Sequence, residues 1–259
     1  MIRTCERTGL ALVESPRTAF RVAKESYGPL NPQERGPLGG DRSGWYRFDT
    51  PGRTIYVAAD AETAFVEALS WARMTHSHRA FLAKTADFMG LPVQEMRRIV
   101  EEEWSANSGM VPGWIPANWR EGRRLYELEF AGGWWIDIAH SATLASLNDS
   151  IGCHLYDDGI LPQTLTLSEV TSGDRLATTL LASYVREQVL DDGSYPMGIR
   201  FPSKHGATGE GEGHCYAFWL RRRDVGLEDE AANVVASRAI PLDDPAYQTA
   251  LRLHSIKSR

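Results

Sequence analysis

The feature that most constrains the fold of this chain is an abrupt change of pattern at Asp60. Residues 54–59 form a short run of β-favouring and small apolar residues directly after the turn pair Pro51-Gly52, which predicts a strand. Asp60 then stands where a helix N-cap belongs, and residues 61–73 place apolar side chains at helical spacing. Any fold for this chain must therefore contain a strand that leads directly into a helix.

The predicted helix over 61–73 has one apolar face, which consists of Ala61, Ala64, Phe65, Ala68, Leu69 and Ala72. Glu67 lies about 130° from the centre of that face, at roughly 100° per residue. Taken alone, a carboxylate in this position is expected to be solvated. Only a cleft against that side of the helix would give Glu67 another role.

Similar patterns predict further elements along the chain. Helices are expected over 93–104, from a cap at Ser141 to Leu147, and from a cap at Asp174 to about Leu190. Strands are expected at 19–22, 197–201, 214–220 and 233–239, and alternating residues over 126–130 and 134–138 predict a β-hairpin. The Trp- and Pro-rich stretch 104–119 is interpreted as irregular.

The length and composition favour one folded domain. A chain of 259 residues with 42% apolar residues can bury a substantial core, so we expect a single domain over residues 1–259 with an insertion at about 75–123. The 28 Lys and Arg residues against 34 Asp and Glu residues give a net charge of −6, which argues against a general nucleic-acid or anionic-membrane binder. An anionic ligand would therefore need a local group of cations.

The cysteines and the start of the chain favour the cytoplasm. Cys5, Cys153 and Cys215 are far apart, form no zinc-binding or redox motif, and fit a reducing compartment. Residues 1–9 lack the apolar stretch of a signal peptide, and no run reaches the roughly 18 apolar residues of a membrane span. We expect a cytoplasmic protein without a metal site.

Three separated blocks resemble the signature blocks of the RES domain family, which is named for its Arg, Glu and Ser. They are Phe20-Arg21-Val22 with Tyr46-Arg47-Phe48-Asp49; Ile55-Tyr56-Val57-Ala58 with Ala61-Glu62-Thr63-Ala64-Phe65-Val66-Glu67; and Gly198-Ile199-Arg200-Phe201-Pro202-Ser203 with Lys204-His205-Gly206. Their order and approximate spacing are those of the family, and the blocks frame most of the chain.

The resemblance implies a mixed α/β (α+β) fold related to ADP-ribosyltransferases, with a split β-sheet, flanking helices and a helical or irregular insertion. By matching position, Arg47, Glu67 and Ser203 become the catalytic residues, while Arg21 and Tyr56 bind substrate. The implied activity is cleavage of the nicotinamide–ribose bond of NAD by phosphorolysis or hydrolysis. NAD is then a substrate, inorganic phosphate is a candidate co-substrate, and no cofactor is needed. Many such proteins look like toxins, so a small DNA-binding antitoxin is the implied partner.

The residue types agree with these roles. The planar fork of an arginine can bind phosphate oxygens bidentately, so Arg21 and Arg47 suit the diphosphate of NAD. Breaking an N-glycosidic bond to ribose builds positive charge on the sugar, which a fixed carboxylate such as Glu67 stabilises. Ser203 can hydrogen-bond the ribose, the nicotinamide amide or a phosphate, and Tyr56 offers a stacking face and a hydroxyl.

Several alternatives stay open from the sequence. An ADP-ribosyltransferase, or an NAD-binding module without catalysis, would use the same residues. Arg21 and Tyr56 fit a structural role equally well, and Ser203 after a proline could shape a turn. The glycine-rich stretch 209–213 lacks the spacing of a phosphate-binding loop, so we interpret it as a connector. The oligomeric state, including a homodimer, also stays open.

Overall fold

The strand-to-helix junction at Asp60 is present in the structure, a computed structural model that describes residues 2–107, 112–207 and 213–258. Strand β5 (Gly52–Ala58) ends just before helix α1 (Ala61–Leu69), and the N–H of Thr63 donates to Asp60 Oδ1 over 2.7 Å. The helix is shorter than expected, because Ser70–Ala72 continues it only as a 3₁₀ turn, η1. The predicted strand, cap and helix are confirmed.

One large mixed sheet holds most of the strands. Its other members are β1 (Ile2–Thr4), β2 (Ala11–Glu14), β3 (Ala19–Lys24), β4 (Glu34–Arg35), β7 (Arg123–Phe130), β8 (Trp134–Asp137), β9 (Gly198–Pro202), β10 (His214–Trp219) and β11 (Ala232–Ala239). The hydrogen-bonded order is β1-β2-β8-β9-β10-β5-β3-β7-β11, and β4 pairs with β5 beside this path. β8 and β9 run parallel. The strands expected at 19–22, 197–201, 214–220 and 233–239 are confirmed, with small shifts at their ends.

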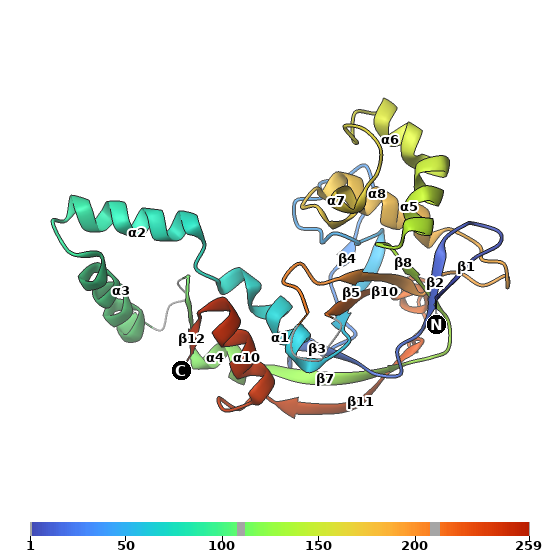
Figure 1. Cartoon of the computed structure of the whole chain (residues 1–259). Coiled ribbons are helices and arrows are strands. Elements are labelled where there is room, and N and C mark those ends of the chain that lie inside the picture. The colour runs from blue at the N-terminus through green and yellow to red at the C-terminus, as the bar shows by residue number, and fades with distance from the viewer. Residues whose placement is uncertain (1, 108–111, 208–212, 259) are drawn as a thin grey trace.

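The sheet almost divides between β3 and β5. Within the described residues, the register of these two strands consists of one pair, Phe20 with Ala58, and the strands diverge beyond it. One half of the sheet consists of the strands β1, β2, β8, β9, β10 and β5, in that order. The other half consists of β3, β7 and β11. Figure 1 shows how the sheet curls so that the second half lies below the first. The mixed α/β fold with a split sheet is therefore as expected.

Helices flank the curled sheet. They are α4 (Ala117–Glu121), α5 (Ser141–Leu147), η2 (Asn148–Gly152), α6 (Cys153–Asp157), α7 (Leu167–Thr171), α8 (Arg175–Arg186), α9 (Arg221–Asp224) and α10 (Pro245–His254). In Figure 1, α5 to α8 lie together above β5, β8 and β10, while α1 and α10 lie side by side near α4. Phe65, Leu181 and Tyr247 bring α1, α8 and α10 into one apolar core. A second core, with Trp135 and Phe218, lies on the opposite face of the sheet.

The predicted hairpin of residues 126–130 and 134–138 is wrong, although both strands exist. β7 pairs with β3 and β11, whereas β8 pairs with β2 and β9. The intervening glycine turn instead carries the chain from one half of the split sheet to the other. The alternation of Tyr126, Leu128 and Phe130 determines which face of the strand is buried, but it does not determine the neighbouring strand.

The two remaining helix predictions are confirmed with adjustments. Helix α5 begins at Ser141, but its cap is His140, whose Nδ1 accepts from the N–H of Ala142 over 3.2 Å. Asp174 caps α8 as expected, and this helix ends at Arg186 rather than near Leu190.

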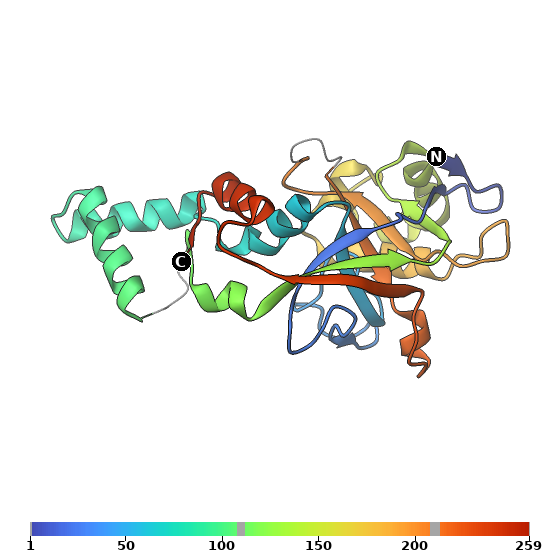
Figure 2. The ribbon, with the colours of Figure 1, turned by 90° about the horizontal axis from the view of Figure 1, so that it is seen from below.

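The expected insertion at 75–123 begins with a helical arm. The sequence predicted α3 (Val93–Asn107) but missed α2 (His76–Phe88), and the two helices pack on each other and project away from the sheet in Figures 1 and 2. The stretch expected to be irregular contains α4 and β6 (Trp114–Ile115), which pairs with β12 (Lys257–Ser258). Residues 108–111 and most of the connector expected at 209–213 lie outside the described residues.

No helix in the described ranges combines the length and the hydrophobicity that a membrane crossing requires.

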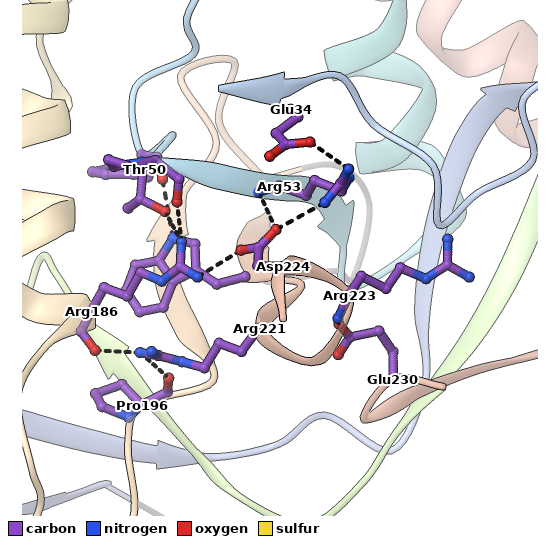
Figure 3. A network of polar contacts seen from close by, with 12 residues as sticks. Glu34, Thr50, Arg53, Arg186, Pro196, Arg221, Arg223, Asp224 and Glu230 are labelled. Carbon is purple, nitrogen blue, oxygen red and sulfur yellow. Dashed lines mark hydrogen bonds and ion pairs between the residues drawn. The ribbon is translucent and has the colours of Figure 1, made fainter. Parts of the chain in front are cut away.

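A polar network fixes the start of β5 (Figure 3). Asp224 of α9 accepts hydrogen bonds from Arg186 Nη2 over 2.7 Å and from the backbone N–H of Arg53 over 2.9 Å. Gly52 has φ +96°, and a Cβ at this position would lie 2.2 Å from the Asp224 carboxylate. The backbone therefore requires glycine here. The network connects β5 to the C-terminal end of α8 and to α9.

Candidate active site

A cavity of about 450 Å³ opens where β3 and β5 diverge. Strand β3 contributes Arg21, β5 contributes Tyr56, and α1 contributes Glu67. The full lining consists of Phe20, Arg21, Val22, Tyr46, Arg47, Tyr56, Val57, Ala58, Ala64, Glu67, Ala68, Ser70, Arg175, Phe201, Lys204, His205 and Cys215. A volume of this size is typical of small-molecule sites.

Glu67 and Ser203 are joined by a short hydrogen bond. Ser203 Oγ donates to Glu67 Oε1 over 2.6 Å and accepts from the N–H of His205 over 3.1 Å. Ser203 is buried directly after β9, and Glu67 is half-buried on the side of α1 that lines the cavity. The cleft that Glu67 needed for a role other than a solvated carboxylate is therefore present.

Tyr56 holds the segment that carries Arg47. Its hydroxyl donates to Asp49 Oδ1 over 2.9 Å and accepts from the N–H of Phe48 over 3.0 Å. Arg35 Nε also donates to Asp49, over 2.7 Å. Burial raises the pKa of Asp49, and burial followed by the charge of Asp49 raises the pKa of Tyr56 well above its usual value. The hydroxyl is thus engaged on both sides, while the ring lines the cavity.

Arg47 is buried, with 8% of its surface exposed. Its guanidinium lies 4.9 Å from the centre of the Phe201 ring, and Nη1 donates to the carbonyl of Thr171 over 3.4 Å. Burial lowers the pKa of this arginine, and the charge of Glu67 opposes that shift. Arg47 is therefore a desolvated cation facing the Glu67 carboxylate across a shared cavity.

Arg21 is the least satisfied cation of the site. Its Nε and Nη1 atoms are buried and have no hydrogen-bond partner among the described residues. Burial lowers its pKa to about 10. A buried cation without a partner is costly, so its position in the cavity wall points to an anionic ligand.

The cavity is also lined by three basic residues that the sequence analysis did not assign to the site. Arg175 is the first residue of α8, Lys204 donates from Nζ to the carbonyl of Ser172 over 3.0 Å, and His205 stacks edge-on against His254. Burial lowers the pKa of both Lys204 and His205. Lys204 and His205 directly follow Ser203, so the third sequence block could have identified them as site residues. Nothing in the sequence could have identified Arg175, because it follows a helix cap in an ordinary amphipathic pattern.

The site combines a surplus of positive charge with one carboxylate. Arg21, Arg47, Arg175 and Lys204 line the same cavity as Glu67. Cys215 also lines it, but burial, followed by the charge of Glu67, raises the pKa of its thiol and keeps it neutral. Among the described residues, no group of three or more His, Cys, Asp and Glu side chains is arranged to hold a metal ion. The arrangement suits an anionic substrate at which positive charge develops near Glu67.

Four of the five residues singled out from the sequence line this cavity, namely Arg21, Arg47, Tyr56 and Glu67, and the fifth, Ser203, hydrogen-bonds Glu67. They come from β3, the segment before β5, β5 itself, α1 and the end of β9. The structure therefore brings together all three sequence blocks, although their roles in chemistry stay predictions.

Comparisons with known proteins leave the function open. The sequence matches no protein-family model and no curated protein. A chain in the crystal structure of the M. tuberculosis MbcT–MbcA toxin–antitoxin complex is similar to this chain with a TM-score of 0.45 and 12% identity, over 94% of this chain and 92% of that chain. A likeness at this level identifies no function, which must be inferred from the site.

Proposed function

We propose that this protein consumes NAD by cleaving its nicotinamide–ribose bond, as the resemblance to the RES family implies. The observation that carries the proposal is the Glu67 carboxylate, held by Ser203 beside a cavity lined by four cations. The cations suit the diphosphate of NAD, and the carboxylate suits the positive charge that develops on ribose.

The geometry supports a division of labour among the residues. Arg21 and Arg47 bind phosphate oxygens, because their burial leaves them few other partners. Ser203 directs its proton at Glu67, so it orients the carboxylate. Tyr56 fixes the backbone next to Arg47 through Phe48 and Asp49, and its ring contributes a wall of the cavity. Tyr56 is thus a positioning residue for Arg47.

The chemical step uses Glu67 as an electrostatic stabiliser. The bond between ribose C1′ and the nicotinamide nitrogen breaks, and its electron pair stays on that nitrogen, which becomes neutral. Glu67 stabilises the cationic ribosyl group that forms. An oxygen of water, with loss of a proton to solvent, or an oxygen of phosphate then forms the new bond to C1′.

Release of nicotinamide from NAD by the pure protein tests this function. We expect Glu67→Gln to lower kcat at least about a hundredfold, because removing a group that stabilises transition-state charge costs this much. The matched control is Glu62→Gln, on the first turn of the same helix and outside the cavity lining, which should retain activity. Full activity of a folded Glu67→Gln protein would contradict the proposal.

The acceptor and the partner are separate questions. Transfer of label from NAD to a protein or nucleotide, in excess of simple NAD loss, would identify the ADP-ribosyltransferase that the sequence left open. Tight NAD binding without turnover would instead identify a non-catalytic module.

The toxin role and the small DNA-binding antitoxin follow from the family resemblance alone. Co-purification with the product of a neighbouring small reading frame tests them.

A further inference from the structure

The side chain of His205 lies in the cavity but has no role in the proposed function so far. It follows the end of β9, is half-buried, and lines the cavity together with Glu67. Within the described ranges neither of its ring nitrogens makes a hydrogen bond, and the ring of His254 packs edge-on against it at 5.2 Å between ring centres. The imidazole is therefore available to a molecule in the cavity.

Two sets of contacts hold this histidine beside the Glu67–Ser203 pair. The backbone N–H of His205 donates to Ser203 Oγ over 3.1 Å, and Ser203 Oγ donates in turn to Glu67 Oε1. On the other side, Nε2 of the buried His254 lies 2.8 Å from the carbonyl oxygen of Val66. A carbonyl oxygen only accepts, so this nitrogen carries a proton and donates it. His254 is thus fixed to α1, and the ring of His205 packs against a fixed neighbour.

The surroundings of the ring favour a neutral imidazole. The charged and titratable groups that face it are Glu67 on α1, Arg73 after η1, Arg47 before β5 and His254 on α10. Burial lowers the pKa of His205, and the nearby cations lower it further against the opposing charge of Glu67. At neutral pH the imidazole is therefore uncharged and can accept a proton.

We infer that His205 is the general base of the proposed reaction and that the acceptor it activates is water. A water molecule must lose a proton when its oxygen bonds to ribose C1′, whereas a phosphate oxygen is already anionic and needs no base. One O–H bond of water breaks, its proton passes to a ring nitrogen of His205, and the oxygen forms the bond to C1′. The imidazolium then returns the proton to solvent, and the products are nicotinamide and ADP-ribose. The inference rests on the proposed function and specifies its acceptor.

Nicotinamide release by His205→Gln, measured with and without inorganic phosphate, tests this role. Without phosphate we expect kcat to fall at least about a hundredfold, because a general base usually contributes this much. The substitution retains the backbone N–H that contacts Ser203, so the hydrogen bond from Ser203 to Glu67 should persist. The matched control is His76→Gln, which replaces an exposed histidine on α2 and should behave like the wild type.

The response to phosphate distinguishes a base from a structural residue. Any release that phosphate stimulates should persist in His205→Gln, because that route needs no base. An equal loss of both routes would show a structural role and contradict the inference. A wild type that cleaves NAD only when phosphate is added would also overturn the inference, while the proposed function would stand.

The pH dependence provides a second measurement. Cleavage of NAD by the wild type without phosphate should fall as the pH decreases through an apparent pKa below about 6.5, the ordinary value for histidine, because protonation removes the base. The residual activity of His205→Gln should lack this decrease. Wild-type activity in the variant, or the same decrease at low pH, would refute the role of His205 and leave the proposed function intact. A wild type that releases no nicotinamide under any of these conditions would refute both.

Discussion

At the scale of single residues, Arg21 should contribute to binding at the expense of stability. Two of its guanidinium nitrogens are buried without a partner, so Arg21→Met should raise the free energy of unfolding by about 1–3 kcal/mol, the cost of such unsatisfied groups. The same change should reduce NAD cleavage, because it removes a phosphate ligand. Urea denaturation without ligand, with the exposed Arg17→Met as control, measures the first effect. A less stable Arg21→Met protein would show that the guanidinium is satisfied after all.

The residues of the site differ in how well the sequence identifies them. The helical pattern of 61–69 placed Glu67 off the apolar face, and the family resemblance indicated its role. Nothing in the pattern could show the cavity, because its opposite wall comes from β3 and from Lys204 and Arg175, which are distant in sequence. Tyr56 illustrates the same difficulty. The sequence analysis offered its hydroxyl as a group that could contact substrate, but in the fold this hydroxyl donates to Asp49.

At the scale of elements, the start of β5 depends on one carboxylate. Asp224 accepts from Arg186 and from Arg53, and the side chains of Arg186 and Asp224 are 11% and 13% exposed. Asp224→Asn should therefore lower the free energy of unfolding by about 3 kcal/mol, because it leaves the largely buried Arg186 without a countercharge. Asp229→Asn, which disrupts only the exposed pair with Arg222, should change it by less than about 1 kcal/mol. Chemical denaturation of both variants checks the difference, and equal effects would contradict the assigned role of the network.

The positions of helices and strands were easier to predict than the pairing of the strands. Caps at Asp60 and Asp174 identified α1 and α8, because the capping hydrogen bonds are local. The pairing of β7 with β3 and β11 depends on segments about a hundred residues away in either direction, which local alternation does not specify. Helix α2 was missed since its apolar residues are mostly exposed and do not follow a core-facing pattern.

At the scale of the whole molecule, the split in the sheet determines where chemistry can occur. If β3 and β5 continued to pair beyond Phe20 and Ala58, the backbone would close the space that Arg21 and Tyr56 now line. The network around Asp224 holds β5 at its start, away from the one residue pair with β3 at Ala58, and α8 extends from that network to Arg175 at the cavity. The same helix therefore connects the network around Asp224 with the cavity.

The arm formed by α2 and α3 should be the least stable part of the described fold. In α2 only Ala86 is buried, while Phe81 and Phe88 are 72% and 89% exposed, and helices of this length are marginal without packing. Amide hydrogens of α2 should therefore exchange at least about tenfold faster than those of α8, a helix of similar length with Leu181 and Val185 in the core. Hydrogen exchange followed by mass spectrometry, on the full chain at low concentration, measures both helices together. Equal protection of α2 and α8 would contradict this prediction, and protection of α2 that rises with protein concentration would show that a second copy covers the arm.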